Sequence, residues 1–503
     1  MVNIATPELY SAYKASMQKI ADIRFSAALL QWDQETYMPP KSISKRAQQI
    51  ATLTEIAHQL FTNEEMGNLL EELSQRGDLT ADEQRNTELS LYDYNKEKKL
   101  SSEFVRSMSE TISQSFESWM SGRKANSFRV FEKDLARLLA LKKEQAYQLG
   151  YEGHPYNALL NEYEKGATVE QLNDIFDVIE QPLSNLIQKI SDQPQVADDF
   201  LLKHFPEQQQ WDYGMELVKN LGFDFKAGRQ DFAEHPFPTN FSSKDVRITT
   251  RIDEHNFGNM TWSCLHELGH ALYEQGLPDS EYGLPLSEYA SLSIHESQSR
   301  LWENNVGRSE GFWNHNILML KSKFTSQLEG IDARSFFKGI NKVQPSLIRT
   351  EADELTYHFH VMIRYKLEKL LIAGELTARD IPAAWNELYK EHLGVVVPDD
   401  KQGCLQDVHW SHGSFGYFPT YSLGSLYAAQ IFATAAKQLP FLKEDINNGK
   451  TSALLAWLRT HIHEHGRKYT SSQLCRTITG ETLNVNYFLQ YAVDKYQDIY
   501  NFK

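Results

Sequence analysis

The sequence predicts a mainly α-helical protein with a small β-sheet beside one helix that carries the chemistry. Three observations support this fold class. Apolar residues recur at three- and four-residue spacing from residue 7 to about 240, apolar and polar residues alternate over Asp245–Asp253, and a His-Glu-x-x-His pattern follows at His266–His270. No low-complexity linker or Pro/Gly-rich hinge divides the 503 residues, so we expect a single domain over residues 1–503.

The first half of the chain predicts helices with one apolar face each. Leu69, Leu70 and Leu73 form one such stripe, and this spacing brings apolar side chains to the same side of a helix. No group of residues in this half has catalytic spacing. We therefore expect residues 1–240 to form a mostly helical wall and residues 241–503 to hold the reactive groups.

The alternation over Asp245–Asp253 predicts a β-strand just before the His-Glu-x-x-His segment. Val246 and Ile248 belong to one face of this strand, and Arg247 and Arg251 belong to the other. Arg247 fits either a solvated strand face or a face turned toward substrate, and the alternation does not decide between the two.

The segment Leu265–Glu274 predicts a helix with a metal site. His266 and His270 leave the same face one turn apart, the spacing with which two imidazoles hold one zinc ion at about 2.0–2.1 Å. Glu267 would lean toward the open side of that ion and take a proton from water, which is typical of a metallopeptidase. Gly269 costs about 1 kcal/mol inside a helix, so we expect another part of the chain to approach it closely.

A metal held by two histidines needs a third ligand and one open position. A second helix is predicted from an N-cap at Ser287 to a stop at Gly307. It offers His295, Glu296 and Glu303 as candidates. Glu296 has few charged neighbours in the sequence, and we prefer it as the ligand.

Charge and composition exclude several classes of partner. The chain has 51 Lys+Arg against 67 Asp+Glu and a net charge of −16, which repels phosphate backbones, so nucleic acid is not expected as a partner. Met1–Pro7 has neither a charged n-region nor an apolar h-region, and no run approaches 18 apolar residues. We expect a cytoplasmic protein without a membrane partner. The three cysteines are too widely spaced for a disulfide framework.

Five motifs, all in order, resemble those of the carboxypeptidase Taq family of metallocarboxypeptidases. They are Asp245–Thr249, His266–His270, His295–Gln298, Ile348–Asp353 and Gly403–Trp410. The resemblance implies a helical fold with a deep substrate groove, related to neurolysin and angiotensin-converting enzyme, and often a homodimer. It also implies removal of C-terminal residues from peptides with broad specificity.

The resemblance further implies the roles of four residues. His266, His270 and Glu296 bind the metal, and Glu267 is the catalytic base. The family uses zinc or cobalt. Histidine and glutamate ligands suit zinc, cobalt and manganese to differing degrees, so the residues themselves do not identify the metal.

A carboxypeptidase must recognise the free C-terminal carboxylate of its peptide substrate. A planar guanidinium can bind a carboxylate with two hydrogen bonds, and we assign this role to Arg349, with Arg247 as the runner-up. Asp353 would orient Arg349. The alternative for Arg349 and Asp353 is an ion pair on a helix surface, because they are spaced i, i+4.

A loop rich in glycine and aromatic residues follows Asp407. His409 is our first candidate for stabilising the charge that develops on the carbonyl oxygen, and Tyr421 is the second. For the tyrosines of this stretch, a buried aromatic cluster is an equally good interpretation.

One competing pattern occurs near the end of the chain. His461–His465 satisfies His-x-x-Glu-His, the inverted zinc motif. We interpret it as a polar helix end, because Glu481 is the only glutamate that follows it.

Two alternative functions remain open. One is an oligopeptidase or dipeptidase with the same metal centre. The other is a non-catalytic helical scaffold that binds peptides and has a structural metal, although such a site would not need Glu267.

Overall fold

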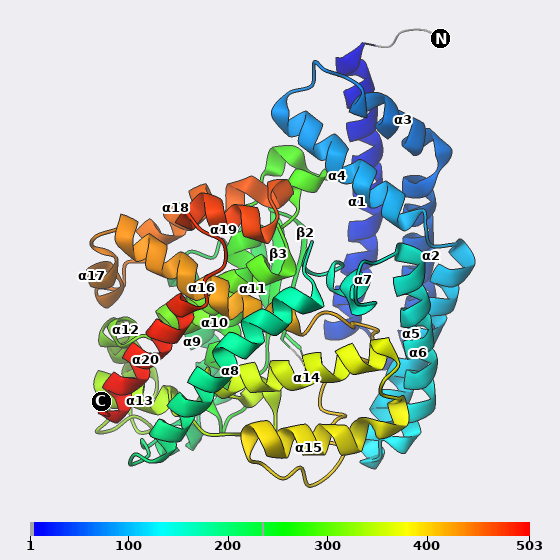
Figure 1. Ribbon diagram of the computed structural model, residues 1–503. Coiled ribbons are helices and arrows are strands. Elements are labelled where there is room, and N and C mark those ends of the chain that lie inside the picture. The colour runs from blue at the N-terminus through cyan, green and yellow to red at the C-terminus, as the bar shows by residue number, and fades with distance from the viewer. Residues whose placement is uncertain (1–4, 234–235, 503) are drawn as a thin grey trace. The chain divides into compact units, whose positions relative to one another are not determined.

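The computed structural model describes residues 5–233 and 236–502, so residues 1–4 of the N-terminal stretch Met1–Pro7 lie outside the description. Over the described residues the chain forms twenty α-helices and three strands, which confirms the predicted fold class (Figure 1). The chain divides into two compact units. The first unit comprises Met1–Lys98, Asp198–Ile340 and Ile431–Thr482, and the second comprises Lys99–Ala197, Asn341–Gln430 and Leu483–Lys503. The single-domain organisation stays a prediction.

The first unit contains the three strands and most of the helices. Its strands are β1 (Gly228–Phe232), β2 (Pro238–Ser242) and β3 (Asp245–Thr250), and its helices are α1 (Thr6–Thr36), α2 (Ile43–Thr62), α3 (Glu64–Ser74), α4 (Ala81–Glu97), α9 (Glu207–Asn220), α10 (Phe257–Glu274), α11 (Leu292–Arg300), α12 (Glu310–Lys323), α13 (Ala333–Ile340), α17 (Leu442–Asn447), α18 (Ser452–His461) and α19 (Ser471–Thr479). A core cluster around Tyr13, Phe61 and Leu70 joins α1 to α2 and α3, and it contains the Leu69–Leu73 stripe that the sequence predicts.

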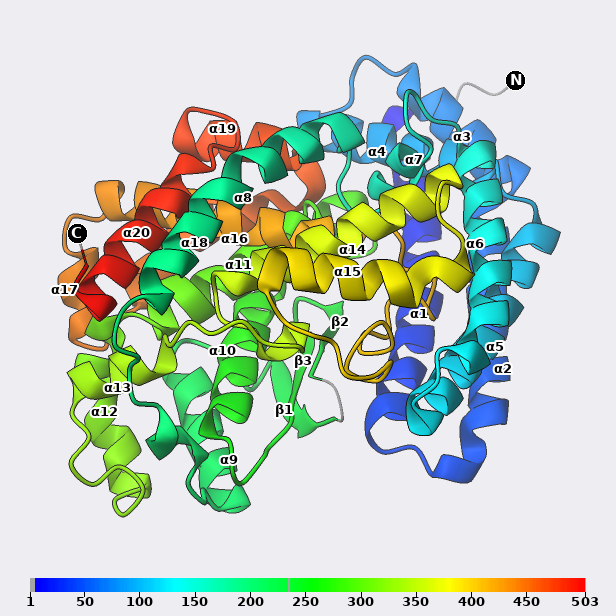
Figure 2. The same cartoon turned by 60° about the horizontal axis from the view of Figure 1, so that its bottom comes forward.

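The second unit is helical throughout. Its helices are α5 (Ser102–Ala125), α6 (Arg129–Leu149), α7 (Tyr156–Leu160), α8 (Val169–Ser191), α14 (Thr356–Ala373), α15 (Ile381–Leu393) and α20 (Asn486–Tyr500), while α16 (Pro419–Gln438) contributes residues to both units. Figure 2 shows α14 and α15 running side by side. Among the described residues, no helix is both long and apolar enough to cross a membrane.

The sheet lies against α10, the helix that carries the two histidines. Its strand order is β1-β3-β2, with β1 parallel and β2 antiparallel to β3. Val246 and Ile248 are fully buried, which confirms the predicted strand and its apolar face. The helical prediction up to residue 240 is wrong for β1 and for the start of β2, since both are short and carry no apolar alternation that would mark a strand.

Gly269 is the point at which α11 packs most closely on α10. A Cβ at this position would lie 2.4 Å from the Gln298 carbonyl oxygen and 2.5 Å from Ser299 Cα. The predicted close approach is confirmed. Only glycine leaves room for this contact, and the contact fixes which residues of α11 face the two histidines.

The start of the second helix differs from the prediction, whereas its end agrees. Ser287 is not the N-cap, because Pro285–Ser287 forms a separate helical turn of its own. Ser291 is the cap instead, and its hydroxyl accepts a hydrogen bond from the Ile294 backbone N–H. After Arg300 the chain continues as a π-helix over Leu301–Gly307 and ends at the predicted glycine.

Candidate active site

The three side chains that the sequence predicts as metal ligands lie close together in the first unit. His266 and His270 lie on α10, and Glu296 lies on α11. The Nε2 atoms of the two histidines are 3.6 and 3.5 Å from Glu296 Oε2. One ligand atom from each residue lies within 4.8 Å of the others. Two imidazole nitrogens and one carboxylate oxygen are a donor set that suits a divalent transition metal.

Two of these three side chains form hydrogen bonds with neighbouring residues, and each keeps one nitrogen or oxygen atom directed at the other members of the group. His266 Nδ1 donates to Glu303 Oε2 at 2.9 Å, so Nε2 carries the lone pair. Arg300 Nε donates to Glu296 Oε1 at 2.7 Å, which leaves Oε2 directed at the histidines. Such partners are usual around metal-binding histidines and carboxylates. Glu303, a candidate ligand in the sequence, is therefore a hydrogen-bond partner of His266 in this structure.

His295, the other candidate ligand, supports His270 from the side. The two imidazole rings stack at 4.4 Å with 21° between their planes. His295 Nε2 donates to Glu274 Oε1 at 2.7 Å, and Glu274 Oε2 accepts from Asn240 at 2.6 Å. This chain of contacts ties the position of the His270 ring to strand β2.

Glu267 and His270 have buried polar atoms with no hydrogen-bond partner among the described residues, Glu267 Oε2 and His270 Nδ1. Burial raises the pKa of Glu267 to about 7 and lowers that of His270 to about 3. His270 is thus neutral, the form in which an imidazole can bind a metal. Burial would also raise the pKa of Glu296, but Arg300 and His266 outweigh it and hold that pKa below its usual range. The residues present therefore fit a divalent cation.

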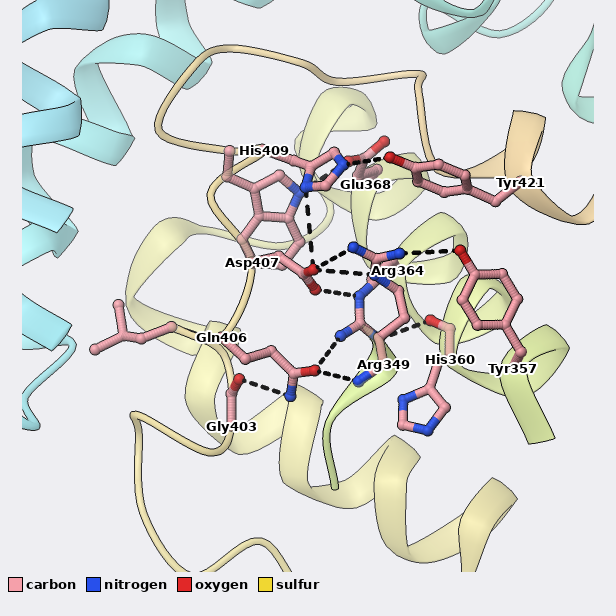
Figure 3. A network of polar contacts seen from close by, with 12 residues as sticks. Arg349, Tyr357, His360, Arg364, Glu368, Gly403, Gln406, Asp407, His409 and Tyr421 are labelled. Atoms are coloured by element: carbon pink, nitrogen blue, oxygen red, sulfur yellow. Dashed lines mark hydrogen bonds and ion pairs between the residues drawn. The ribbon is translucent and has the colours of Figure 1, made fainter. Parts of the chain in front are cut away.

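Arg349 lies in the second unit and is buried, but its partner is not the predicted one. Its Nε and Nη2 donate to Asp407 Oδ1 at 3.0 and 2.8 Å, and its Nη1 donates to Tyr357 at 3.0 Å (Figure 3). Asp353 does not orient Arg349. It accepts hydrogen bonds from the Leu355 and Thr356 backbone N–H groups at the start of α14, because the chain turns after Glu351 and the i, i+4 relation on one helix is lost.

Arg247, the runner-up, is held within the first unit. Its guanidinium donates to both oxygens of Asp245 at 2.9 and 3.0 Å. It also lies over the rings of Trp32 and Phe241, 4.4 and 4.9 Å from their centroids. These contacts account for its position without a substrate.

His409 and Tyr421 contact each other in the second unit. His409 Nε2 lies 2.8 Å from the Tyr421 hydroxyl, and His409 Nδ1 lies 4.0 Å from Asp407 Oδ1. Burial, followed by Arg349, lowers the pKa of His409 to about 3, so the ring is neutral near pH 7. The tyrosine stretch is also an aromatic cluster, since the rings of Tyr417 and Tyr421 lie 5.0 Å apart. The role of His409 and Tyr421 in stabilising charge on the carbonyl oxygen stays a prediction.

The His461–His465 pattern is a helix end, as the sequence predicts. Helix α18 ends at His461, whose Nδ1 contacts the Trp457 carbonyl oxygen and whose ring stacks on the indole of the same residue. Within the described parts of the chain, no group of metal ligands forms around these histidines.

Sequence reasoning missed three supporting side chains: Arg300, Glu274 and Arg364. Arg300 follows Glu296 by one helical turn, and this i, i+4 spacing was a usable signal. Glu274 and Arg364 have partners that are distant in the sequence. No local pattern identifies them.

His463 makes a testable contribution to acid stability. It is fully buried, Nε2 donates to Gln298 Oε1 at 3.0 Å, and burial lowers its pKa from 6.5 to about 3. The unfolded chain therefore takes up a proton first as the pH falls below 6.5, and the folded state loses stability until about pH 3. Between pH 7 and pH 5 this single group removes about 2 kcal/mol of unfolding free energy.

Urea denaturation of the wild type and of His463→Gln at both pH values measures this effect. We expect the acid-induced loss to be about 2 kcal/mol smaller in the variant. Equal losses in the two proteins would contradict a buried neutral histidine at this position.

Comparison with known proteins extends the similarity beyond the motifs. The family model described as carboxypeptidase Taq (M32) metallopeptidase matches residues 12–496. Thermostable carboxypeptidase 1 of Thermus thermophilus is 37% identical over 510 residues, covering 98% of this chain and 100% of that protein. The crystal structure of the M32 carboxypeptidase from Deinococcus radiodurans R1 superposes with a TM-score of 0.95 at 37% identity, covering 98% of this chain and 100% of that one. A solved structure called "The Structure of CHT" is 56% identical, with a TM-score of 0.94 over 97% of this chain and 99% of that one.

Proposed function

The chain belongs to the carboxypeptidase Taq (M32) metallopeptidase family and is a metal-dependent carboxypeptidase, and we propose that His266, His270 and Glu296 hold its metal. One observation carries this proposal. The three ligand atoms converge within 4.8 Å, while Glu267 on the same helix has a buried oxygen without a partner among the described residues. Zinc or cobalt is the metal that we propose.

Glu267 acts as the general base. A divalent cation bound by these ligands would polarise the scissile carbonyl and acidify water. Glu267 accepts the proton from water and then delivers it to the nitrogen of the leaving amine. Its pKa of about 7, raised by burial, suits both steps near neutral pH. Arg300 and Glu303 keep Glu296 and His266 fixed during these proton transfers.

Arg349 binds the terminal carboxylate of the substrate, and this contact makes the enzyme an exopeptidase. A guanidinium has five N–H groups. Three hydrogen bonds are formed within the described residues, so two donors remain for a carboxylate. Arg247 is the runner-up, because it is paired with Asp245 and its guanidinium lies over the rings of Trp32 and Phe241.

His409 stabilises the negative charge on the carbonyl oxygen as the water attacks, with Tyr421 as the alternative donor. A neutral imidazole is a suitable donor here, and the two side chains are linked by a hydrogen bond of 2.8 Å. Whichever group donates, the other fixes its orientation.

The remaining properties follow from the family resemblance and from the composition. We propose a cytoplasmic enzyme with a single peptidase domain and a deep groove that accepts peptides with a free C-terminus. Broad side-chain specificity and a homodimeric assembly are part of the same proposal.

The carboxylate contact is tested with a peptide in two forms, with a free and with an amidated C-terminus. We expect the wild type to cleave the free form at least about 100-fold more efficiently in kcat/KM, because a lost charge-assisted contact costs about 3 kcal/mol. Arg349→Lys should lose most of this preference, since lysine cannot reproduce the paired hydrogen bonds. Arg247→Lys is the matched control and should keep it.

Equal cleavage of both forms by the wild type would overturn the role of Arg349. Loss of the preference in Arg247→Lys, but not in Arg349→Lys, would exchange the two roles.

A further inference from the structure

Helix α14 is buried along most of its length, yet it carries two charged side chains one turn apart. Arg364 and Glu368 both have 0% exposure. Burying a charge is unfavourable unless hydrogen bonds and opposite charges compensate it. The hydrogen-bond partners of Arg364 and Glu368 therefore show which part of the chain α14 holds in place.

Arg364 forms hydrogen bonds with the first part of the segment Gly403–Phe418, which carries His409. Its Nε donates to Asp407 Oδ2 at 2.6 Å, and its Nη2 donates to Gln406 Oε1 at 2.8 Å. Its Nη1 donates to the His360 carbonyl oxygen at 2.8 Å within α14 itself. Arg364 is thus anchored to its own helix and fixes two neighbouring residues of the segment.

The same two residues of the segment orient Arg349. Figure 3 shows the Asp407 carboxylate facing both guanidinium groups, with Oδ1 bonded to Arg349 and Oδ2 bonded to Arg364. Gln406 Oε1 also accepts from the Arg349 backbone N–H at 2.9 Å. The third hydrogen bond of the Arg349 guanidinium goes to the hydroxyl of Tyr357, which again belongs to α14.

Glu368 forms hydrogen bonds with the part of the segment that follows His409. Its Oε1 accepts from Trp410 Nε1 at 2.8 Å, and its Oε2 accepts from the Gly416 backbone N–H at 2.8 Å and from the Tyr156 hydroxyl. Gly416 has a φ of 100°, and a Cβ there would lie 2.6 Å from the Leu159 carbonyl oxygen. This end of the segment therefore has a single allowed path past α7.

We infer that Arg364 and Glu368 are positioning residues of the carboxypeptidase, which hold the segment Gly403–Phe418 on either side of His409 and fix Arg349 through Asp407. The inference rests on the proposed roles of Arg349 and His409. Its physical basis is rigidity: each residue joins one helix to two or more points of the segment, and a displacement of about 1 Å at a reacting group can reduce the rate about 100-fold.

Substitutions of Arg364 and Glu368 are expected to have different kinetic effects. Arg364→Lys keeps the charge but cannot bond Asp407, Gln406 and the His360 carbonyl at once. Arg349 then shifts, so KM for a peptide with a free C-terminus should rise about 10- to 100-fold with a smaller change in kcat. The preference for the free over the amidated peptide should fall in proportion.

Glu368→Gln should have the opposite signature. Glutamine has one acceptor oxygen, so either Trp410 or Gly416 loses its partner. His409 then moves while Arg349 stays in place. We expect kcat to fall about 10- to 100-fold with little change in KM, because His409 acts on charge that develops in the transition state.

Tyr365→Phe is the matched control for both variants. Tyr365 is buried on the same helix, and its hydroxyl donates to Val169 and Asn173 rather than to the segment. We expect kcat and KM to remain within about twofold of the wild type, although the melting temperature should fall by a few degrees.

Steady-state kinetics on the free and amidated peptides, together with melting temperatures, test whether Arg364 and Glu368 are positioning residues. The inference is overturned if Arg364→Lys and Glu368→Gln change kcat and KM no more than Tyr365→Phe does, or if both variants change them in the same proportion. If either variant fails to fold, Gln406→Met removes the contacts of Gln406 with Arg349 and Arg364, and Trp410→Phe removes the contact of Trp410 with Glu368. The same comparison of the changes in kcat and KM then tests the inference.

Failure of the proposed function gives a different result. In that case the wild type itself would not distinguish the two peptides, whereas Glu368→Gln would still lower kcat.

Discussion

Replacing Glu267 by glutamine is expected to lower kcat by about 1000-fold, because the amide cannot accept a proton from water. Metal content and KM should change little, since the His266, His270 and Glu296 ligand atoms are untouched. The bell-shaped pH profile of the wild type should lose its acidic limb, because the group with the pKa of about 7 has been removed.

The control for this variant is Glu274→Gln on the same helix. Glu274 is equally buried, but its carboxylate accepts from His295 and Asn240 instead of facing the open side of the metal site. An amide still provides one acceptor for these donors, so we expect a loss below about tenfold. Equal rates for Glu267→Gln and the wild type would remove Glu267 from the mechanism.

Replacing Glu296 by glutamine is expected to abolish metal binding and to lower activity at least about 1000-fold. A neutral amide oxygen is a poor ligand, and the variant also loses the ion pair between Glu296 and Arg300. Metal analysis after dialysis should find substoichiometric metal in the variant. Chelated wild type should recover activity when zinc or cobalt is added, and the variant should not.

Ser299→Ala is the control for this second prediction. It removes the hydrogen bonds from the Ser299 hydroxyl to Glu296 Oε2, at 3.1 Å, and to the Glu296 carbonyl oxygen, at 2.7 Å. The carboxylate remains, so metal affinity should fall by less than about tenfold. Full metal content and full activity in Glu296→Gln would show that the third ligand lies elsewhere.

Several features of the fold and of the site were predictable because they depend on short stretches of chain. Helical geometry alone brings His266 and His270 to the same face with Glu267 beside them. The alternation around Val246 and Ile248 predicted strand β3, and these two side chains are fully buried.

The choice among the three candidates for the third ligand depended on tertiary packing. His295, Glu296 and Glu303 lie within nine positions of one another, and no local property distinguishes a ligand from the partner of a ligand. The approach of α11 to α10 at Gly269 places Glu296 Oε2 near the two histidines, which supports the proposal of Glu296 as the ligand. Sequence reasoning detected the close approach but not the rotation of the second helix.

The partner of Arg349 shows the same limit over a longer distance. Asp353 was the nearest acidic residue at helical spacing, whereas Asp407 is the partner, 58 positions along the chain. Arg364 was missed for the same reason, whereas strand β1 was missed because it is short and carries no apolar alternation. The sequence by itself determined the residues that are one helical turn or one strand pleat apart, because backbone geometry sets those relations locally. Only the tertiary structure decided which distant side chains meet, because long-range packing brings them together.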